Sequence, residues 1–164
     1  MPARLSLPIN VYSAEGGQGT TTVAGVIAHF LTSSVESLDP GFELTWGSAL
    51  LAGGRRGPIV RDIGAVSTSP DEPGHRVAVI TGPSVAGAMR LARLIDQSDA
   101  VVLIQEHWRA ISVSDLERAI RRRVDVIIPY SPRVARLADA GLLGAKLPNL
   151  TEFDQLKAWA NVYC

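Results

Sequence analysis

A glycine-rich segment followed by threonines is the part of this chain whose residue types best suit chemistry. It consists of seven residues, Gly16, Gly17, Gln18, Gly19, Thr20, Thr21 and Thr22. Glycine turns let backbone N–H groups converge on a phosphate, and a helix that starts after the turn adds the positive end of its dipole. In such loops a threonine hydroxyl holds Mg²⁺ beside the phosphates. We therefore predict that these residues bind a nucleotide and that Thr21 binds the magnesium ion.

An aspartate farther along the chain is the second candidate magnesium ligand. Asp62 lies near the end of residues 59–64, an apolar stretch whose composition predicts a strand. Carboxylate oxygens are hard ligands that suit Mg²⁺, either directly or through water. The alternative interpretation is that Asp62 only caps the turn that Gly64 begins.

For the glycine-rich segment to bind a phosphate, it must lie between a strand and a helix. Residues 7–12 are mostly apolar and predict a short strand. Residues 23–31 have the apolar spacing of a buried helix. Strand, glycine turn and helix follow one another in the order that a phosphate-binding loop requires.

The rest of the chain alternates between predicted strands and helices. Strands are predicted at 42–46, 58–64, 77–81, 100–104 and 124–130, helices at 84–98, 112–122, 131–141 and 150–163, a helical turn at 48–51 and a surface loop at 67–75. Residues 100–104 have no polar face, as expected of a strand that helices cover on both sides. The alternation predicts an α/β fold, with a doubly wound and mostly parallel sheet and helices on both faces. No composition shift divides residues 1–164, so a single domain is expected.

Three segments resemble the ParA/MinD family of partitioning ATPases. Residues 14–22 look like the deviant Walker loop of that family, which is Lys-Gly-Gly-x-Gly-Lys-Thr-Thr. Residues 59–64 resemble its apolar strand ending in an acid that holds magnesium through water, and residues 124–141 resemble its late strand, nucleotide-base loop and helix. The resemblance covers most of the chain. It implies a P-loop NTPase-like fold, a site for ATP or ADP with Mg²⁺, and a dimer whose subunits face each other across their nucleotide sites.

Two loop residues depart from the pattern of the family. Glu15 stands where the family has the lysine that reaches across the dimer, and Thr20 stands where it has the lysine that grips the phosphates. Each charge-assisted contact to a phosphate is worth roughly 1.5–3 kcal/mol, and Glu15 adds a negative charge, so weak nucleotide binding is expected. The second acid of the family is also missing, because residues 42–46 offer only Glu43. Little or no ATP hydrolysis is therefore expected.

Three interpretations of the loop remain open at this level: a turn kept only for folding, residual nucleotide or anion binding, and an unusual ATPase. The leading hypothesis is a ParA/MinD-like partitioning or positioning protein, dimeric with itself or with a full-length relative, in DNA or plasmid segregation or as a scaffold. The alternative is an ATP-dependent switch in a mixed complex whose partner supplies the missing cation, with Arg55 or Arg56 as a further source. A weaker third hypothesis is an α/β module that binds another anionic ligand.

A cluster of arginines ends the helix predicted at 112–122. Its members are Arg118, Arg121, Arg122 and Arg123. In the ParA/MinD family, basic residues on the outer helices hold DNA through its phosphates, so the resemblance implies nonspecific DNA contact. The alternative is a solvated helix end whose cations suit the helix dipole. The formal net charge of zero argues against a nucleic-acid affinity spread over the whole chain.

The last residues space their apolar side chains as a helix would. MinD-type proteins use a C-terminal amphipathic helix to sit on membranes, but residues 150–163 carry only one basic residue, Lys157. This helix is therefore predicted to pack against the domain or a partner.

The only cysteine is Cys164, and no apolar stretch approaches the ~18 residues of a membrane span. We expect a cytoplasmic protein without a membrane span.

Overall fold

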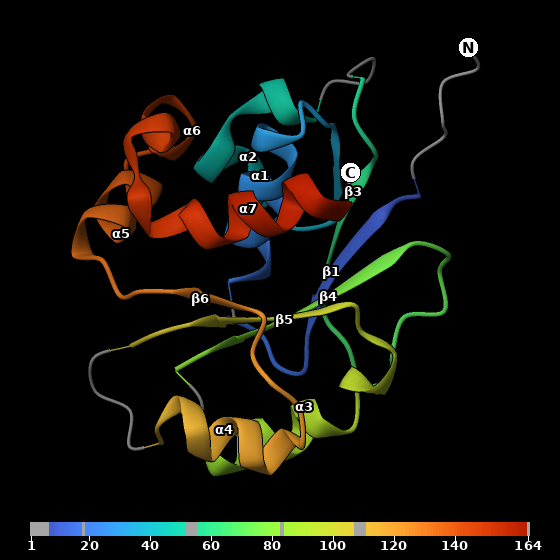
Figure 1. Ribbon diagram of the computed structural model, residues 1–164. Coiled ribbons are helices and arrows are strands. Elements are labelled where there is room, and N and C mark those ends of the chain that lie inside the picture. Colours follow the sequence, from blue (N-terminus) through green and yellow to red (C-terminus); the bar gives the residue numbers. More distant parts are fainter. Residues whose placement is uncertain (1–6, 18, 52–55, 83, 107–110, 164) are drawn as a thin grey trace.

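A parallel β-sheet organises the protein (Figure 1). The computed structural model describes residues 7–17, 19–51, 56–82, 84–106 and 111–163. Within these residues, six strands pair in the order β2 (Val35–Ser37), β3 (Val60–Ala65), β1 (Ile9–Ser13), β4 (His75–Thr81), β5 (Ala100–Ile104) and β6 (Val126–Ile128). Every pairing is parallel. The predicted α/β fold with a parallel sheet is confirmed.

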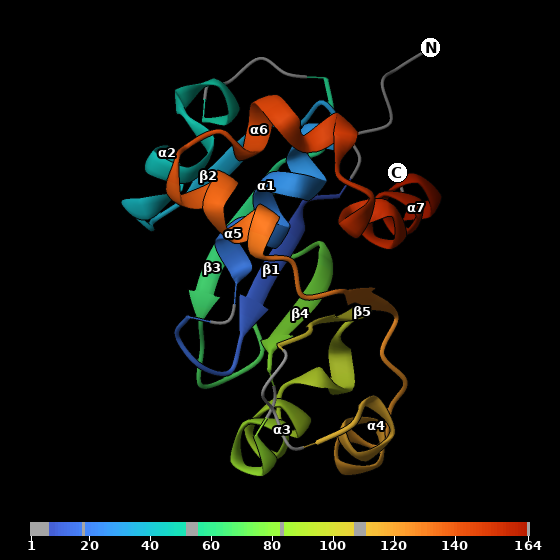
Figure 2. The same ribbon diagram turned by 90° about the vertical axis from the view of Figure 1, so that its left-hand side faces the viewer.

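Helices cover both faces of the sheet (Figures 1 and 2). One layer contains α1 (Thr20–Phe30), α2 (Gly41–Trp46), α5 (Pro132–Asp139), α6 (Leu143–Lys146) and α7 (Asp154–Tyr163), and the other contains α3 (Val85–Ala92) and α4 (Val113–Ile120). Two apolar cores result, one on each face. All residues of β1 are buried between them. Burial on both faces explains why the central strands are nearly unbroken apolar runs.

A glycine in the middle of α1 allows the closest helix contact in the larger core. Gly25 lies directly under the indole ring of Trp46, so a Cβ at that position would overlap the ring. The indole Nε1–H of Trp46 also donates a hydrogen bond to the carbonyl oxygen of Thr21, 3.1 Å away. The α2 helix is thus fastened to the first turn of α1, next to the glycine-rich loop.

The predicted strand at 42–46 is wrong, because these residues belong to α2. Phe42 and Trp46 are buried whereas Leu44 is 80% exposed. The alternation of three large apolar residues suggested a strand, but Phe42 and Trp46 are also spaced by one helical turn, and that spacing decides the structure. The strand that follows α1 is instead the short β2, in which only Val35 is buried.

The strand predicted at 100–104 is found with the same bounds as β5, and the other predicted elements are present with shifted ends. The helix predicted at 84–98 is shorter in the structure. It covers Val85–Ala92 as α3, and Ile95–Gln97 form a separate 3-10 turn. The strand predicted at 124–130 shrinks to β6, which is followed by Pro129, a residue without a backbone N–H for the ladder. The helical turn predicted at 48–51 is found as a 3-10 helix, Ser48–Leu50. Ser112 caps α4 together with Asp115, and Ser131 caps α5.

The C-terminal helix packs against the domain, which is one of the two predicted alternatives; the other was packing against a partner. It contacts α1 and β6, and Leu156 and Ala160 are fully buried. The Lys157 ammonium lies over the Phe30 ring, 5.2 Å from its centroid. On the other side of the helix, the side-chain oxygen of Gln155 accepts a hydrogen bond of 2.9 Å from the backbone N–H of Ile127 in β6.

Candidate functional site

The glycine-rich loop connects the end of β1 to the start of α1. Gly17 and Gly19 adopt left-handed backbone conformations, with φ of 71° and 82°, which glycine adopts without a steric cost. A Cβ on Gly19 would come within 2.5 Å of Ile104 Cδ1 in β5, whereas a Cβ on Gly16 or Gly17 would meet nothing within 4 Å. The loop therefore packs closely on the sheet at one end and faces open space at the other. The predicted ligand Gln18 lies outside the described residues.

Side-chain oxygens of β3 and of the segment after β2 lie close to the Thr21 hydroxyl. Its Oγ1 is 2.8 Å from Asp62 Oδ2 and 2.9 Å from Asp39 Oδ2. The Ser37 hydroxyl donates a 3.0 Å hydrogen bond to the same Asp62 oxygen. Thus the structure brings together the two predicted magnesium ligands, Thr21 and Asp62, and adds Ser37 and Asp39. Asp62 lies in the middle of β3 rather than at its end.

These oxygens fit a magnesium ion. A hydroxyl has one proton, so the Thr21 hydroxyl satisfies only one of its two carboxylate neighbours, and its other contact joins two electron-rich oxygens. Asp62 is 4% exposed, and its Oδ1 is buried without a hydrogen-bond partner. Two carboxylates and two hydroxyls are the hard oxygen donors that Mg²⁺ prefers. Among the described residues, no group of three or more His, Cys, Asp or Glu side chains could hold a metal ion by itself, so a site here needs the hydroxyl oxygens beside the two carboxylates.

Asp39 was missed in the sequence, where Glu43 was the only acid considered for this region. Glu43 is an exposed residue of α2. Asp39 lies two residues after the end of β2. Besides its contact with Thr21, its carboxylate accepts a 2.8 Å hydrogen bond from the backbone N–H of Gly41, which holds the start of α2. A usable signal was the pair Asp39-Pro40 just before the apolar spacing of α2, since an acid before a helix often caps it.

The threonines on either side of Thr21 differ in their surroundings. Thr20, at the lysine position of the resemblance, is 8% exposed in the first turn of α1. Thr22 lines a cavity of about 240 Å³. The cavity is bounded by the loop at Gly17 and Gly19, by the carboxyl ends of β4, β5 and β6, and by α5. In parallel α/β sheets, ligands bind outside the carboxyl ends of the strands.

Most side chains around this cavity are apolar. They are Ile104, Ile128, Pro129, Val134, Ala135, Ala138 and Phe153, with Thr81, Gln105, Glu106, Tyr130 and Ser131 as polar members. Residues 124–141, which resemble the base loop of the family, contribute one wall. Among the described residues that line the cavity, none is Lys or Arg. The part of the cavity that the described residues line is therefore mainly apolar and offers no cation.

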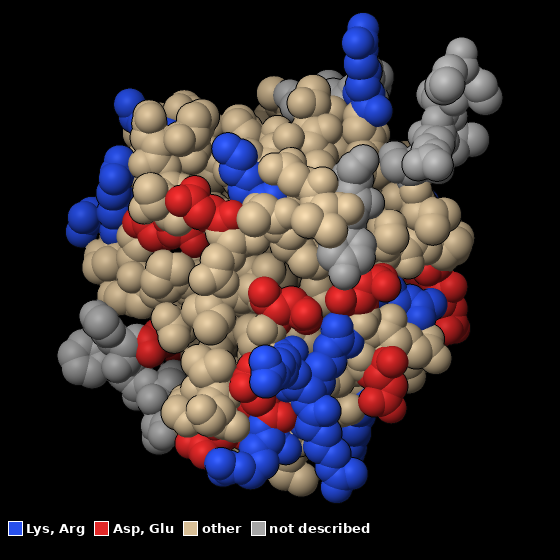
Figure 3. Space-filling model, in the orientation of Figure 1, with Lys and Arg blue, Asp and Glu red and all other residues tan. Residues whose placement is uncertain are grey.

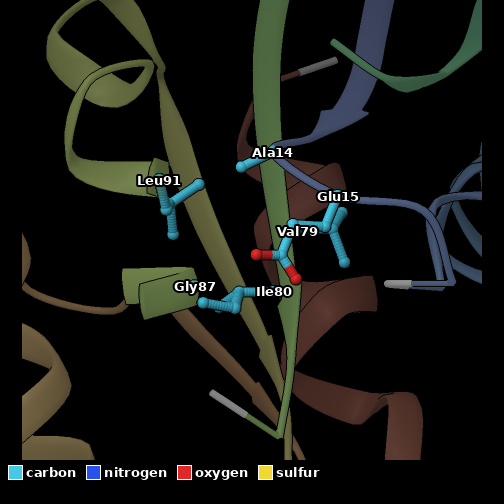
Figure 4. A pocket seen from close by; sticks show the side chains of 6 residues that line it. All are labelled: Ala14, Glu15, Val79, Ile80, Gly87 and Leu91. Atoms are coloured by element: carbon cyan, nitrogen blue, oxygen red, sulfur yellow. The ribbon is translucent and has the colours of Figure 1, made fainter. Parts of the chain in front are cut away.

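Glu15 points toward α3. Its carboxylate extends toward Gly87 at the start of α3, beside a small cavity of about 10 Å³, large enough for one water molecule (Figure 4). There it accepts a hydrogen bond from the guanidinium of Arg90. The expected negative charge at the phosphate position is therefore turned toward α3 and paired with a cation of the same chain.

The arginine cluster is partly engaged within the protein. Lys and Arg side chains gather with a few acids on the lower half of the face in Figure 3, around α4. Arg122 donates to the carbonyl oxygens of Ile95, Ser98 and Asp99 and fastens α4 to the turn before β5. Arg118 pairs with Asp115 at 3.0 Å. Arg121 and Arg123 are exposed, and no ion pair joins either of them to another described residue.

The remaining predictions concern Arg55, Arg56 and the membrane. Arg55 lies outside the described residues, and Arg56 is exposed. In the part of the chain that the structure describes, no helix has the length and apolar character needed to cross a membrane.

Comparisons with known proteins support the fold. No protein-family model and no curated protein sequence matches the chain. Among solved structures, MinD from Aquifex aeolicus superposes with a TM-score of 0.71 at 13% identity, over 96% of each chain. A ParA family ATPase from Chlorobium tepidum superposes with a TM-score of 0.66 at 13% identity, over 95% of this chain and 98% of the other.

A third structure is a nucleotide-binding protein from Archaeoglobus fulgidus in complex with ADP. It superposes with a TM-score of 0.57 at 16% identity, over 85% of this chain and 88% of the other. At such identities the likeness is one of fold. Along nearly its whole length, this chain therefore has the α/β fold of the ParA/MinD P-loop ATPases.

Proposed function

We propose that this chain is a ParA/MinD-like partitioning or positioning protein that works as a dimer with little or no ATP hydrolysis. The observation that carries the proposal is a glycine-rich loop that has two left-handed glycines and no cationic side chain of its own. Gly17 and Gly19 adopt left-handed conformations, and the Thr21 hydroxyl lies beside two carboxylates. From Leu5 to Gly54 the chain contains no Lys or Arg, so the loop and the helix behind it bring no positive side chain to a phosphate.

The loss of both lysines favours a fixed assembly over a nucleotide-driven switch. In the family that the loop resembles, dimerisation is tied to ATP because the two sites face each other. Here the position of the lysine that reaches across the dimer holds Glu15, an acid that pairs with Arg90 of its own chain. A dimer of this protein would form independently of ATP and serve as a scaffold in a segregation or positioning system.

The proposal is tested by the mass of the purified protein in solution. Light scattering is expected to give a dimer without nucleotide, with no change on addition of Mg-ATP, and a phosphate-release assay is expected to stay at background. A monomer that dimerises only with Mg-ATP, or steady phosphate release, would overturn the proposal.

A second candidate function is an ATP-dependent switch in a mixed complex. It is favoured by the Thr21, Ser37, Asp39 and Asp62 oxygens, which fit Mg²⁺, and by the cavity next to the loop. A ParA/MinD-type partner would supply the missing cation across the interface. In that case the isolated chain is inert, and phosphate release appears only when the partner is added.

DNA contact is proposed only for the members of the arginine cluster that form no ion pair with another described residue. Arg121 and Arg123 are available for phosphates, whereas Arg118 and Arg122 have partners within the chain. Two cations per subunit predict weak binding with a shallow salt dependence. We further propose that the protein binds Mg-ATP or Mg-ADP only weakly. We also propose that it is cytoplasmic.

A further inference from the structure

The glycine-rich loop has to obtain its positive charge from another element. The loop contains no Lys or Arg, and the sequence has none between Arg4 and Arg55. Backbone N–H groups and the N-terminal end of a helix attract an anion only moderately. Charge-assisted hydrogen bonds from a cationic side chain are the strongest contacts to a phosphate. Among the described residues, the guanidinium in contact with the loop is that of Arg90, which donates to Glu15 Oε1.

Arg90 is placed to change partners. Its side chain is 62% exposed, so most of its guanidinium donors face solvent, while the Glu15 carboxylate is 31% exposed. Ion pairs at such exposure add little to stability because water screens them, so exchanging one partner for another is cheap. Directly after Glu15 come Gly16 and Gly17, beside which a Cβ would meet no atom within 4 Å. The carboxylate that holds the guanidinium therefore belongs to the residue that directly precedes the open turn in the chain.

We propose that Arg90 is the anion-binding residue of the loop. At rest its guanidinium is held by Glu15, and a phosphate group that settles on the Gly16–Gly17 turn takes the place of the Glu15 carboxylate. Arginine suits this exchange because its planar donors match carboxylate and phosphate oxygens equally well. The ligand is the phosphate of a nucleotide or a free phosphate, and the inference rests on the proposed function in treating the loop as a surviving phosphate loop.

This assignment predicts opposite effects for the two partners of one ion pair. Loss of Arg90 removes the cation that the phosphate needs. Loss of the Glu15 charge releases Arg90 from its competitor and removes a repulsion. A purely structural clamp between the loop and α3 would behave differently, because either substitution would then weaken the loop in the same direction.

The test is calorimetric titration of Mg-ADP into the full chain and five variants: Arg90→Gln, Arg90→Lys, Glu15→Gln, the double variant Glu15→Gln/Arg90→Gln and Arg93→Gln. Arg93→Gln is the matched control, since it removes an equal charge from an exposed residue beside the same helix. Arg90→Gln is expected to weaken Mg-ADP binding about tenfold or more. Glu15→Gln is expected to strengthen it, and the double variant to resemble Arg90→Gln. Arg90→Lys, which keeps the charge, should retain most of the affinity.

Two further ligands identify what Arg90 recognises. Adenosine, which lacks phosphate, should bind all variants alike, and pyrophosphate should follow the pattern of Mg-ADP if the phosphate alone is recognised. Equal affinities of Arg90→Gln and Arg93→Gln, or a weakening by Glu15→Gln, would overturn the assignment. So would the absence of Mg-ADP binding in every variant at millimolar concentration. The nucleotide-free dimer of the proposed function is measured separately by light scattering and stands or falls on that result.

Discussion

The Thr21 hydroxyl carries one proton but lies within hydrogen-bonding distance of two carboxylates, those of Asp39 and Asp62. Such an arrangement lacks a positive charge, and Mg²⁺ or a lysine ammonium would supply one. The side chain before it is Thr20, whose position in the loop is where the resembling family places its phosphate-binding lysine. A single substitution there therefore asks whether the loop still has the shape of a phosphate site.

We expect Thr20→Lys to raise the affinity for Mg-ATP by about tenfold to a hundredfold, as one charge-assisted contact of roughly 1.5–3 kcal/mol implies. Isothermal titration calorimetry measures the change. Thr68→Lys is the control, since Thr68 is an exposed residue of the loop before β4. Equal affinities of the two variants would mean that the loop backbone does not cradle phosphates. Glu15→Lys is a poorer probe, because it would place a second cation against Arg90.

At the scale of elements, the approach of α2 to α1 depends on a missing side chain. Gly25→Ala is expected to destabilise the protein by about 1–3 kcal/mol, because the new methyl group overlaps the Trp46 ring and overpacking outweighs the better helix propensity of alanine. Gly144→Ala is the matched control. Its Cβ would lie 3.6 Å from the other side of the same indole, an ordinary contact. Urea unfolding should give a lower midpoint for Gly25→Ala and no loss for Gly144→Ala.

The start of α5, which walls the cavity, depends on a carboxylate. Ser131 caps this helix and donates a 2.6 Å hydrogen bond to Glu152 Oε1. This hydrogen bond is the main reason that the pKa of Glu152 is lowered from its ordinary 4.5. A lowered pKa in the folded state means that the contribution is complete above pH 4.5 and is lost as the pH falls through the folded-state value.

Glu152→Gln is therefore expected to lower the melting temperature at neutral pH by a few degrees at most, since the carboxylate is partly exposed. The difference from the unchanged protein should shrink as the pH falls below the ordinary glutamate value. Thermal unfolding at a series of pH values measures both. A difference that stays constant down to the acid end of the series would mean that the ionised carboxylate is not what supports the cap.

At the scale of the molecule, local patterns predicted the order of elements and the loop, because periodicity and glycine spacing are local properties. They missed β2, since only one of its three residues is buried and such a strand has no apolar run. They predicted a strand where α2 lies, since the apolar residues at 42, 44 and 46 fit the two-residue period of a strand and those at 42 and 46 also fit one turn of a helix. Contacts between distant residues were also missed, such as the Glu15–Arg90 pair, which spans 75 positions, because tertiary packing alone creates them.

The hydrogen bond from Ile127 to the Gln155 side chain has a consequence for solubility. In the described sheet β6 is an outer strand, and an outer strand offers unpaired amides that can recruit a strand from another molecule. Gln155 occupies the amide at the centre of β6, and Pro129, next to the strand, has no amide to offer. Helix α7 therefore hinders edge-to-edge aggregation at β6, in addition to packing its apolar side chains against the core.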